Sequence, residues 1–336
     1  MPKKAAKKAA AKKPKKKAPA SPQKLVAELM REFEKRLGPN ELIMPADVEA
    51  MLASLNGPLP TEGLSDEEAD ARDEAQQIAL DAMEAETEAE ARKLAKRALR
   101  LDPDCVDALV VMTDLDARTM REAIEGLQKA VAAGERSLGE KFIRENKGHF
   151  WMLLDTRPYM RALQSLGEAY RSAGVNLDAI KIYEKMLELN PNDNQGVRDP
   201  LLGLYLETGD LKGAAGVLKK YKEDASANFA WARVLERFMA GDRDGASTAL
   251  KAARKSNRHV ELLLTQKQAL PKELPDMYAP GSAEEAVLCL SFLSGALTEH
   301  AEVSSWLFDQ FAADGVLPPP SEAKLKRMAI ARKSVQ

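Results

Sequence analysis

Residues 160–193 decide the fold of this chain, and they read MRALQSLGEAYRSAGVNLDAIKIYEKMLELNPND. Leu163, Leu166 and Tyr170 recur at the spacing of one face of an α-helix. A second apolar stripe with helical spacing follows, and Pro191 ends it because proline has no amide hydrogen with which to continue a helix. The stretch therefore predicts two antiparallel helices joined by a short turn.

Small residues stand where the two predicted helices come closest, with Gly167 on the first and Ala179 on the second. The whole pattern resembles the tetratricopeptide repeat, which it matches in type and spacing at Leu163, Leu166, Gly167, Tyr170, Ala179, Tyr183 and Pro191. The resemblance implies hairpins that stack into a solenoid with a concave face that binds other proteins.

Weaker copies of the unit flank it. The alanine of the second helix recurs at Ala91, Ala123, Ala179, Ala214 and Ala246. Gly209–Asp210 and Gly241–Asp242 stand where hairpin turns are expected. One hairpin cannot bury both of its apolar faces, so several must stack. We therefore predict an all-α fold, a right-handed α-solenoid over residues 65–311.

Helix starts support this layout. A hydroxyl residue followed three positions later by glutamate is the pattern of a capping box, and it occurs at Ser65–Glu68, Thr87–Glu90, Thr119–Glu122 and Ser282–Glu285. These pairs predict helices near 66–85, 88–101, 120–133 and 283–298. No sustained period-2 alternation predicts a strand.

Outside the repeats the chain divides into shorter segments. Two short helices are expected in 25–57, either as a cap on the solenoid end or as a partner-binding or dimerising arm, and 58–64 is expected to be a linker. Residues 134–158 break the repeat period and are expected to be an irregular insert. A hairpin of 283–298 and 300–311 is expected to close the solenoid, before a Pro-rich and then basic tail at 312–336.

The formal net charge of −2 hides a strong asymmetry. Residues 1–24 carry ten lysines and no acid, whereas residues 61–90 carry twelve acids and one base, Arg72. Like-charge repulsion and the lack of large apolar residues predict that the N-terminal segment is disordered. It resembles the Lys-Ala-Pro tails of linker histones and of histone-like bacterial proteins.

That resemblance implies salt-sensitive binding of nucleic-acid phosphates without sequence preference. The residues concerned are Lys3, Lys4, Lys7, Lys8, Lys12, Lys13, Lys15, Lys16, Lys17 and Lys24. The alternatives are a solubilising arm or a segment that folds back on the acidic residues 61–90.

Two polar strings resemble a known family. They are residues 148–161, with Gly148–Trp151 and Asp155–Arg161, and residues 190–198. The chain is similar over roughly 145–310 to bacterial tetratricopeptide proteins of unassigned function, related to the suppression-of-tumorigenicity proteins of animals. The resemblance implies a binding scaffold and supplies no catalytic residue. Asp199–Pro200 and Cys289 depart from the family pattern.

The candidate site is a polar recognition surface around the strong repeat. Its members are His149, Arg157, Arg161, Gln164, Glu168, Arg171, Asn194 and Arg198. The alternative is a structural network that fixes the insert to the repeats, since Arg–carboxylate pairs and helix caps often serve packing alone. Glu168 stands at a groove position and would repel a terminal carboxylate, which disfavours capture of C-terminal chaperone peptides.

The sequence contains no motif typical of an enzyme active site or a metal site. The three histidines and the two cysteines have no metal-ligand spacing, and no Gly-rich phosphate loop, GxSxG or HExxH motif occurs. No apolar run is long enough for a membrane span, and two lone cysteines suit a reducing compartment. The sequence thus predicts a cytoplasmic protein-protein interaction scaffold without enzymatic activity, metal or cofactor. Nucleoid or nuclear location is the alternative if the tail binds nucleic acid.

Overall fold

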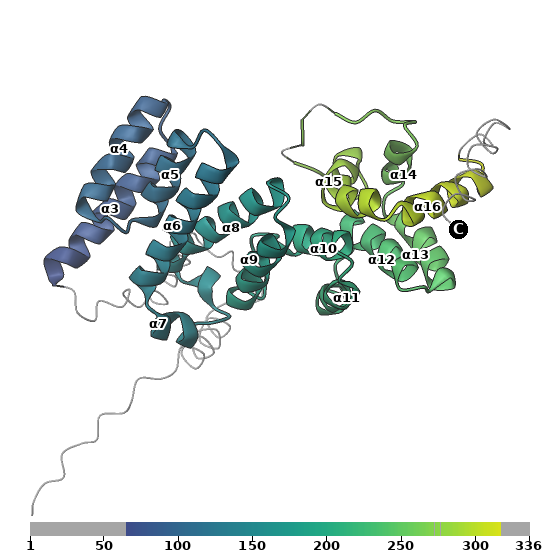
Figure 1. The fold of residues 1–336 in the computed structure, drawn as a ribbon, viewed down its shortest axis with the longest axis horizontal. Coiled ribbons are helices and arrows are strands. Elements are labelled where there is room, and N and C mark those ends of the chain that lie inside the picture. Colours follow the sequence, from purple (N-terminus) through teal and green to yellow (C-terminus); the bar gives the residue numbers. More distant parts are fainter. Residues whose placement is uncertain (1–64, 272, 276, 317–336) are drawn as a thin grey trace, which may run out of the picture. The chain divides into compact units, whose positions relative to one another are not determined.

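The structure is a computed structural model that describes residues 65–271, 273–275 and 277–316. Within these ranges every regular element is a helix and none is a strand (Figure 1). Successive helices pair into hairpins, so the prediction of an all-α, tetratricopeptide-like solenoid is confirmed. The hairpins are α3 (Asp66–Met83) with α4 (Glu88–Leu101), α5 (Val106–Asp116) with α6 (Met120–Leu138), α8 (Arg157–Ser172) with α9 (Asn176–Leu189), α10 (Arg198–Glu207) with α11 (Leu211–Lys220), and α12 (Ala227–Met239) with α13 (Arg243–Ser256).

Several predicted segments lie outside the described residues. They are the basic segment 1–24, the helical pair 25–57, the linker 58–64 and residues 317–336 of the C-terminal tail.

Glycines set the closest approaches inside the repeats. A Cβ added to Gly167 would lie 2.6 Å from the ring of Tyr183, so only glycine lets α8 and α9 pack at this separation. Gly134 of α6 faces the ring of Tyr159 on α8 in the same way, also at 2.6 Å. Both tyrosine side chains are buried. The predicted role of Gly167 is therefore confirmed.

Helix starts follow the predicted caps in part. The hydroxyls of Ser65, Thr87, Thr119 and Ser282 all accept the amide hydrogen three residues later. Only at Ser65 does the glutamate bond back to the amide of the capping residue, at 2.8 Å. The carboxylates of Glu122 and Glu285 instead accept from the amide one residue earlier, that of Arg118 or Gly281.

The irregular insert begins later than expected. α6 continues through Gly134 to Leu138 because Tyr159 packs against that glycine, and the helix ends at Gly139, whose φ of +73° suits a residue without a side chain. A short helix α7 (Glu140–Glu145) follows, and then two single 3-10 turns, η1 (Phe150–Met152) and η2 (Leu154–Thr156).

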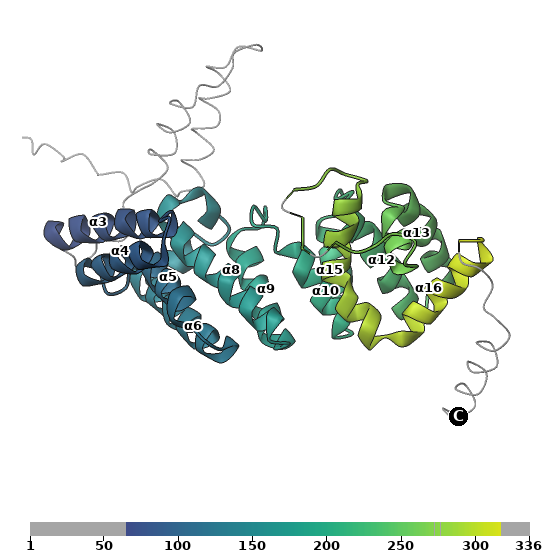
Figure 2. The ribbon, with the colours of Figure 1, turned by 90° about the horizontal axis from the view of Figure 1, so that it is seen from above.

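The C-terminal helices do not form the closing hairpin that the sequence suggested. They are α14 (His259–Leu264), α15 (Ala283–Glu299) and α16 (Ala301–Ala313). α16 packs at the end of the last repeat, where Trp306 lies 4.8 Å from Phe238 between ring centroids. α15 packs mainly on α10 and α12 rather than on α16 (Figure 2).

Candidate functional site

The first helices of the hairpins form one side of the repeat array, which we call the first-helix face; it comprises α3, α5, α8, α10 and α12. Neighbouring first helices contact one another, α3 with α5, α5 with α8, and α10 with α12. Ligand grooves of tetratricopeptide repeats lie on this side, which makes it the candidate binding surface.

α15 covers the C-terminal part of the first-helix face. It packs along α10 and also contacts α12. A Cβ at Gly203 of α10 would lie 2.2 Å from the carbonyl oxygen of Phe292, so the two helix backbones nearly touch there. Farther along, a Cβ at Gly295 of α15 would collide with the carboxylate of Glu207. This part of the first-helix face is therefore covered by the chain itself.

The amino-acid sequence of α10 explains why it is covered. All six residues from Leu201 to Leu206 are buried, which is more than one apolar stripe. A helix that is apolar all round must be surrounded on every side. The run is visible in the sequence and indicates that another element covers α10. The repeat pattern alone does not indicate this, because it requires only one apolar stripe per helix.

A buried carboxylate anchors the start of α15. Glu285 accepts hydrogen bonds from the amides of Ala227, at 2.9 Å, and Gly281, at 2.7 Å. The side-chain amide of Asn257 donates to the same carboxylate at 2.9 Å. These bonds join the N-termini of α12 and α15 to the end of α13, and sequence reasoning treated Glu285 only as part of a cap.

The first-helix face of α3, α5 and α8 carries a cluster of polar side chains, and none of the described helices packs over it as α15 packs over α10. Arg161 of α8 donates to the buried Asp107 of α5 from both its Nε, at 3.0 Å, and its Nη2. Gln76 of α3 donates to the same carboxylate at 2.7 Å. Asp107 therefore ties three neighbouring first helices together, since it accepts from both Gln76 of α3 and Arg161 of α8.

Gln164 and Glu168 lie one and two turns farther along α8. Gln164 donates to the carboxylate of Glu168 at 3.1 Å and accepts from the side chain of Gln195 at 2.8 Å. Glu168 is exposed and Gln164 is half-buried. This pair forms the accessible polar centre of the predicted surface.

Arg171 lies at the end of α8, beside a small cavity. The cavity measures about 160 Å³ and lies between α8, α10 and α15. The Nε of Arg171 is buried without a hydrogen-bond partner. Burial raises the pKa of Tyr183 to about 12, and the nearby guanidinium of Arg171 opposes that shift.

Arg198 occupies a separate cluster at the start of α10. Its Nε donates to Asp224 at 2.9 Å, and its Nη1 donates to the buried Asp193 at 3.3 Å. Its guanidinium also lies 5.2 Å from the ring centroid of Tyr221. Asp193 accepts the amide hydrogens of Val197 and Arg198 as well, so this cluster fixes the turn before α10.

The remaining predicted residues stand apart from these groups. Arg157 donates to the carbonyl of Trp151 at 3.3 Å and stacks over its ring. His149 is half-buried in the turn before η1, and Asn194 is exposed in the turn after α9. No described hydrogen bond or ion pair links His149, Arg157 or Arg198 to the Gln164–Glu168 pair. The structure thus divides the predicted surface into several local clusters.

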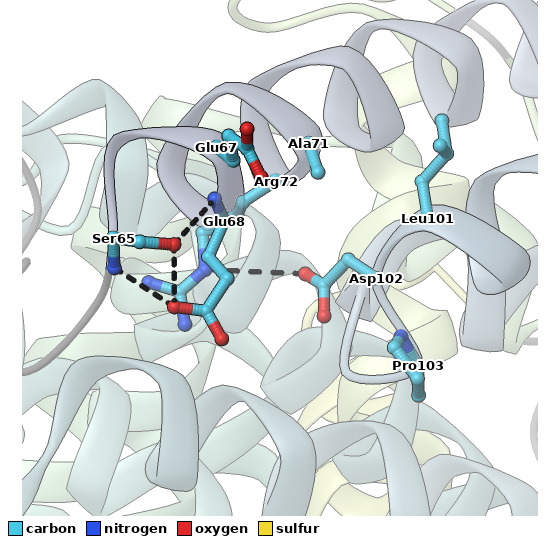
Figure 3. A pocket seen from close by; sticks show the side chains of 8 residues that line it. All are labelled: Ser65, Glu67, Glu68, Ala71, Arg72, Leu101, Asp102 and Pro103. Atoms are coloured by element: carbon cyan, nitrogen blue, oxygen red, sulfur yellow. Dashed lines mark hydrogen bonds and ion pairs between the residues drawn. The ribbon is translucent and has the colours of Figure 1, made fainter.

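Two larger hollows lie away from the first-helix face of α8. Figure 3 shows a pocket of about 500 Å³ where the start of α3 meets the end of α4. Glu68 closes its capping box there, and Arg72 lies 4.0 Å from Asp102. The other hollow, of about 720 Å³, lies between α6, α7 and α9 and is crossed by an ion pair of Lys185 with Glu135 at 2.6 Å.

Within the described ranges, neither hollow is lined by a histidine or a cysteine. In the described residues no group of histidine, cysteine and carboxylate side chains is suited to hold a metal ion. Burial raises the pKa of Cys105 to about 11 and also raises the pKa of Cys289, which keeps both thiols protonated. His300 bonds to the carbonyl of Leu206 and His259 to Gln268, so both serve local structure.

Comparisons with known proteins show a partial likeness to solved structures. No protein-family model matches the chain, and no curated protein matches it. Among solved structures, the chain is similar to a protein from a study of Pseudomonas aeruginosa PilF. That protein is 19% identical, the match covers 56% of this chain and 92% of that chain, and the TM-score is 0.28.

Proposed function

We propose that this chain is a non-catalytic scaffold that binds a peptide or helix of another protein on the first-helix face of α3, α5 and α8. The observation that supports this proposal is the contrast along that face. The apolar part, on α10 and α12, is covered by α15, whereas the part on α8 presents Gln164 and Glu168. A polar face fixed by buried hydrogen bonds is preorganised for recognition at little entropic cost.

The partner is expected to be polar or basic at its contact with α8. Glu168 is an exposed acidic residue beside Gln164, whereas the buried Asp107 is already paired with Arg161. A cationic side chain or a free amide of the partner would therefore complement this site. Arg161 and Arg198 act as positioning residues because both are bonded to buried carboxylates.

Site-specific photo-cross-linking tests the proposal in the full chain in its host cell. A photoreactive amino acid in place of Gln164 should give an adduct with another protein, whereas the same group at Lys219, an exposed position on α11, should not. Glu168→Lys should reduce the adduct at position 164. Glu223→Lys makes the same change in charge at another exposed position and should leave it unchanged. Equal yields of adduct at positions 164 and 219 would contradict the proposal.

We also propose that the chain is related to the bacterial relatives of the suppression-of-tumorigenicity proteins, lacks enzymatic activity and is cytoplasmic. Each of these properties suits a scaffold. Among the described residues, no helix combines the length and hydrophobicity that a membrane span requires.

Nucleic-acid association through Lys3–Lys24 is the second candidate, and the charge of +10 on residues 1–24 favours it. These lysines lie outside the described residues. Titration of DNA binding against salt, with and without residues 1–24, tests it. Unchanged affinity after the deletion would remove this candidate.

A further inference from the structure

The connection between α14 and α15, residues 265–282, exposes large apolar side chains. Leu270, Leu274, Met277 and Tyr278 are 62%, 61%, 83% and 54% exposed. No other connection between described helices exposes so many. Several large apolar side chains exposed close together in the sequence often mark an interaction site. Single exposed apolar residues are common and need no explanation.

The connection is longer than is needed to join α14 to α15. α14 and α15 pack against each other, so a few residues would join them. Connections longer than about 12 to 15 residues without regular structure are uncommon and usually functional.

Both ends of the connection are fixed to the repeats. The amide of Gln268 donates to the carbonyl of Leu262 at 3.0 Å, and its side chain contacts His259 at 2.8 Å. At the other end the amide of Gly281 donates to the buried Glu285, and Asn257 donates to the carbonyl of Ser282 at 2.7 Å. The exposed residues are thus presented from a rigid base.

Prolines restrict the backbone of the exposed part. Pro271, Pro275 and Pro280 each fix φ near −65° and push the preceding residue toward extended or polyproline II conformation. A polyproline II helix has three residues per turn. Pro271, Leu274, Met277 and Pro280 are spaced by three, so in this conformation they share one apolar face.

Other recognition modes fit less well. A strand added to a sheet edge needs backbone amide donors, which three prolines remove, and an amphipathic helix cannot contain them. The charges of residues 266–281 cancel, since Lys267 and Lys272 match Glu273 and Asp276. Attraction to an anionic membrane surface is therefore absent.

We propose that Pro271, Leu274, Met277 and Pro280 form a docking segment that a partner protein binds in polyproline II conformation in an aromatic-lined groove. Such grooves read proline-containing segments at low entropic cost because the bound conformation is already favoured. This interaction is independent of the binding face on α8, since here the chain supplies the ligand rather than the groove.

The test places a photoreactive phenylalanine analogue at Tyr278 in the full chain in its host cell. An adduct with one protein is expected, and a synthetic peptide of residues 266–281 should compete with it in lysate, unlike a scrambled peptide. Leu274→Asp and the double variant Pro271→Ala/Pro275→Ala should each reduce the adduct at least about tenfold. Leu177→Asp is the matched control because Leu177 is 67% exposed on α9, and it should have no effect.

The following outcomes would each contradict the proposal. Absence of a protein adduct, or an adduct that Leu274→Asp leaves unchanged, would remove the docking segment. An adduct that survives Pro271→Ala/Pro275→Ala would remove the polyproline II conformation. Flotation with phosphatidylethanolamine–phosphatidylglycerol vesicles that is lost in Leu274→Asp would identify a membrane contact instead. Adducts at position 164 report the scaffold proposal separately, so the two can fail independently.

Discussion

Gly203 shows how one absent side chain positions a whole helix. Its α-carbon faces the carbonyl of Phe292, and a methyl group there would lie 2.2 Å from that oxygen. Because backbone atoms cannot rotate away as a side chain can, an added methyl group would be accommodated only by a shift of the helices. Gly216 of α11 offers the opposite environment, because an added Cβ would meet nothing within 4 Å.

These two glycines give a matched prediction. Gly203→Ala should lower the free energy of unfolding by about 2 to 3 kcal/mol because it overpacks the α10–α15 contact. Gly216→Ala should raise it by about 0.5 to 1 kcal/mol because alanine is the better helix former in open space. Urea denaturation of both variants measures the pair. A neutral Gly203→Ala would contradict the close approach of α15.

Asp199 gives a prediction of pH dependence. Burial raises the pKa of this carboxyl to about 6, and the amide of Asn228 opposes the shift by donating at 2.7 Å. Because the folded state binds the proton more tightly than the unfolded state, the stabilising contribution is complete below about pH 4. It is lost as the pH rises through about 6.

Asp199→Asn removes this ionisation. The stability of the variant relative to the natural chain should therefore increase by about 2 kcal/mol between about pH 4.5 and 7.5. Urea denaturation at several pH values measures the difference, with Asp309→Asn on an exposed part of α16 as control. A difference independent of pH would mean that Asp199 ionises as freely as it does in water.

Among the helices, α15 departs most from the repeat plan. Its anchor is Glu285, which accepts from two backbone amides and one side-chain amide while buried. Truncation of such a group leaves several buried donors without a partner.

Glu285→Ala should therefore lower the free energy of unfolding by about 3 kcal/mol and loosen α15 before the rest of the chain. Glu299→Ala, at the exposed end of the same helix, should change it by less than about 0.5 kcal/mol. Hydrogen exchange of the α15 amides, measured by mass spectrometry, separates a local from a global effect. Equal exchange in the two variants would argue against an anchor at Glu285.

Over the described chain, the repeats differ in which helices they contact. The hairpins α3–α4, α5–α6 and α8–α9 contact only their neighbours, as in other repeat proteins. The hairpins that contain α10 and α12 depend in addition on α15.

Removal of the chain after residue 281 should therefore affect the two parts differently. The amides of α10 to α13 should lose protection from hydrogen exchange, because Leu201–Leu206 would be exposed to water. Those of α3 to α9 should remain protected. Uniform loss of protection would show that the repeats unfold as one cooperative unit.

Local sequence patterns are sufficient to predict the helical hairpins. Cap residues, apolar stripes and the glycine in the strong repeat act over three to seven positions, and such contacts form wherever the local sequence allows them. The repeat period predicts a break at Gly134, but α6 continues through this glycine, which packs against Tyr159 of the next hairpin. The sequence likewise predicts one recognition surface that contains Arg161 and Arg198, whereas each is bonded to a different carboxylate.

The position of α15 was decided only by tertiary packing. Residues 208–282, more than two repeat lengths, separate the apolar residues of α10 from those of α15. Periodicity shows that a helix face is apolar but not which other helix covers it. Backbone hydrogen bonding makes helices from neighbouring residues, whereas burial pairs surfaces irrespective of chain distance. For that reason the all-helical repeats can be predicted from the sequence, whereas the part of the first-helix face that α15 covers is seen only in the tertiary structure.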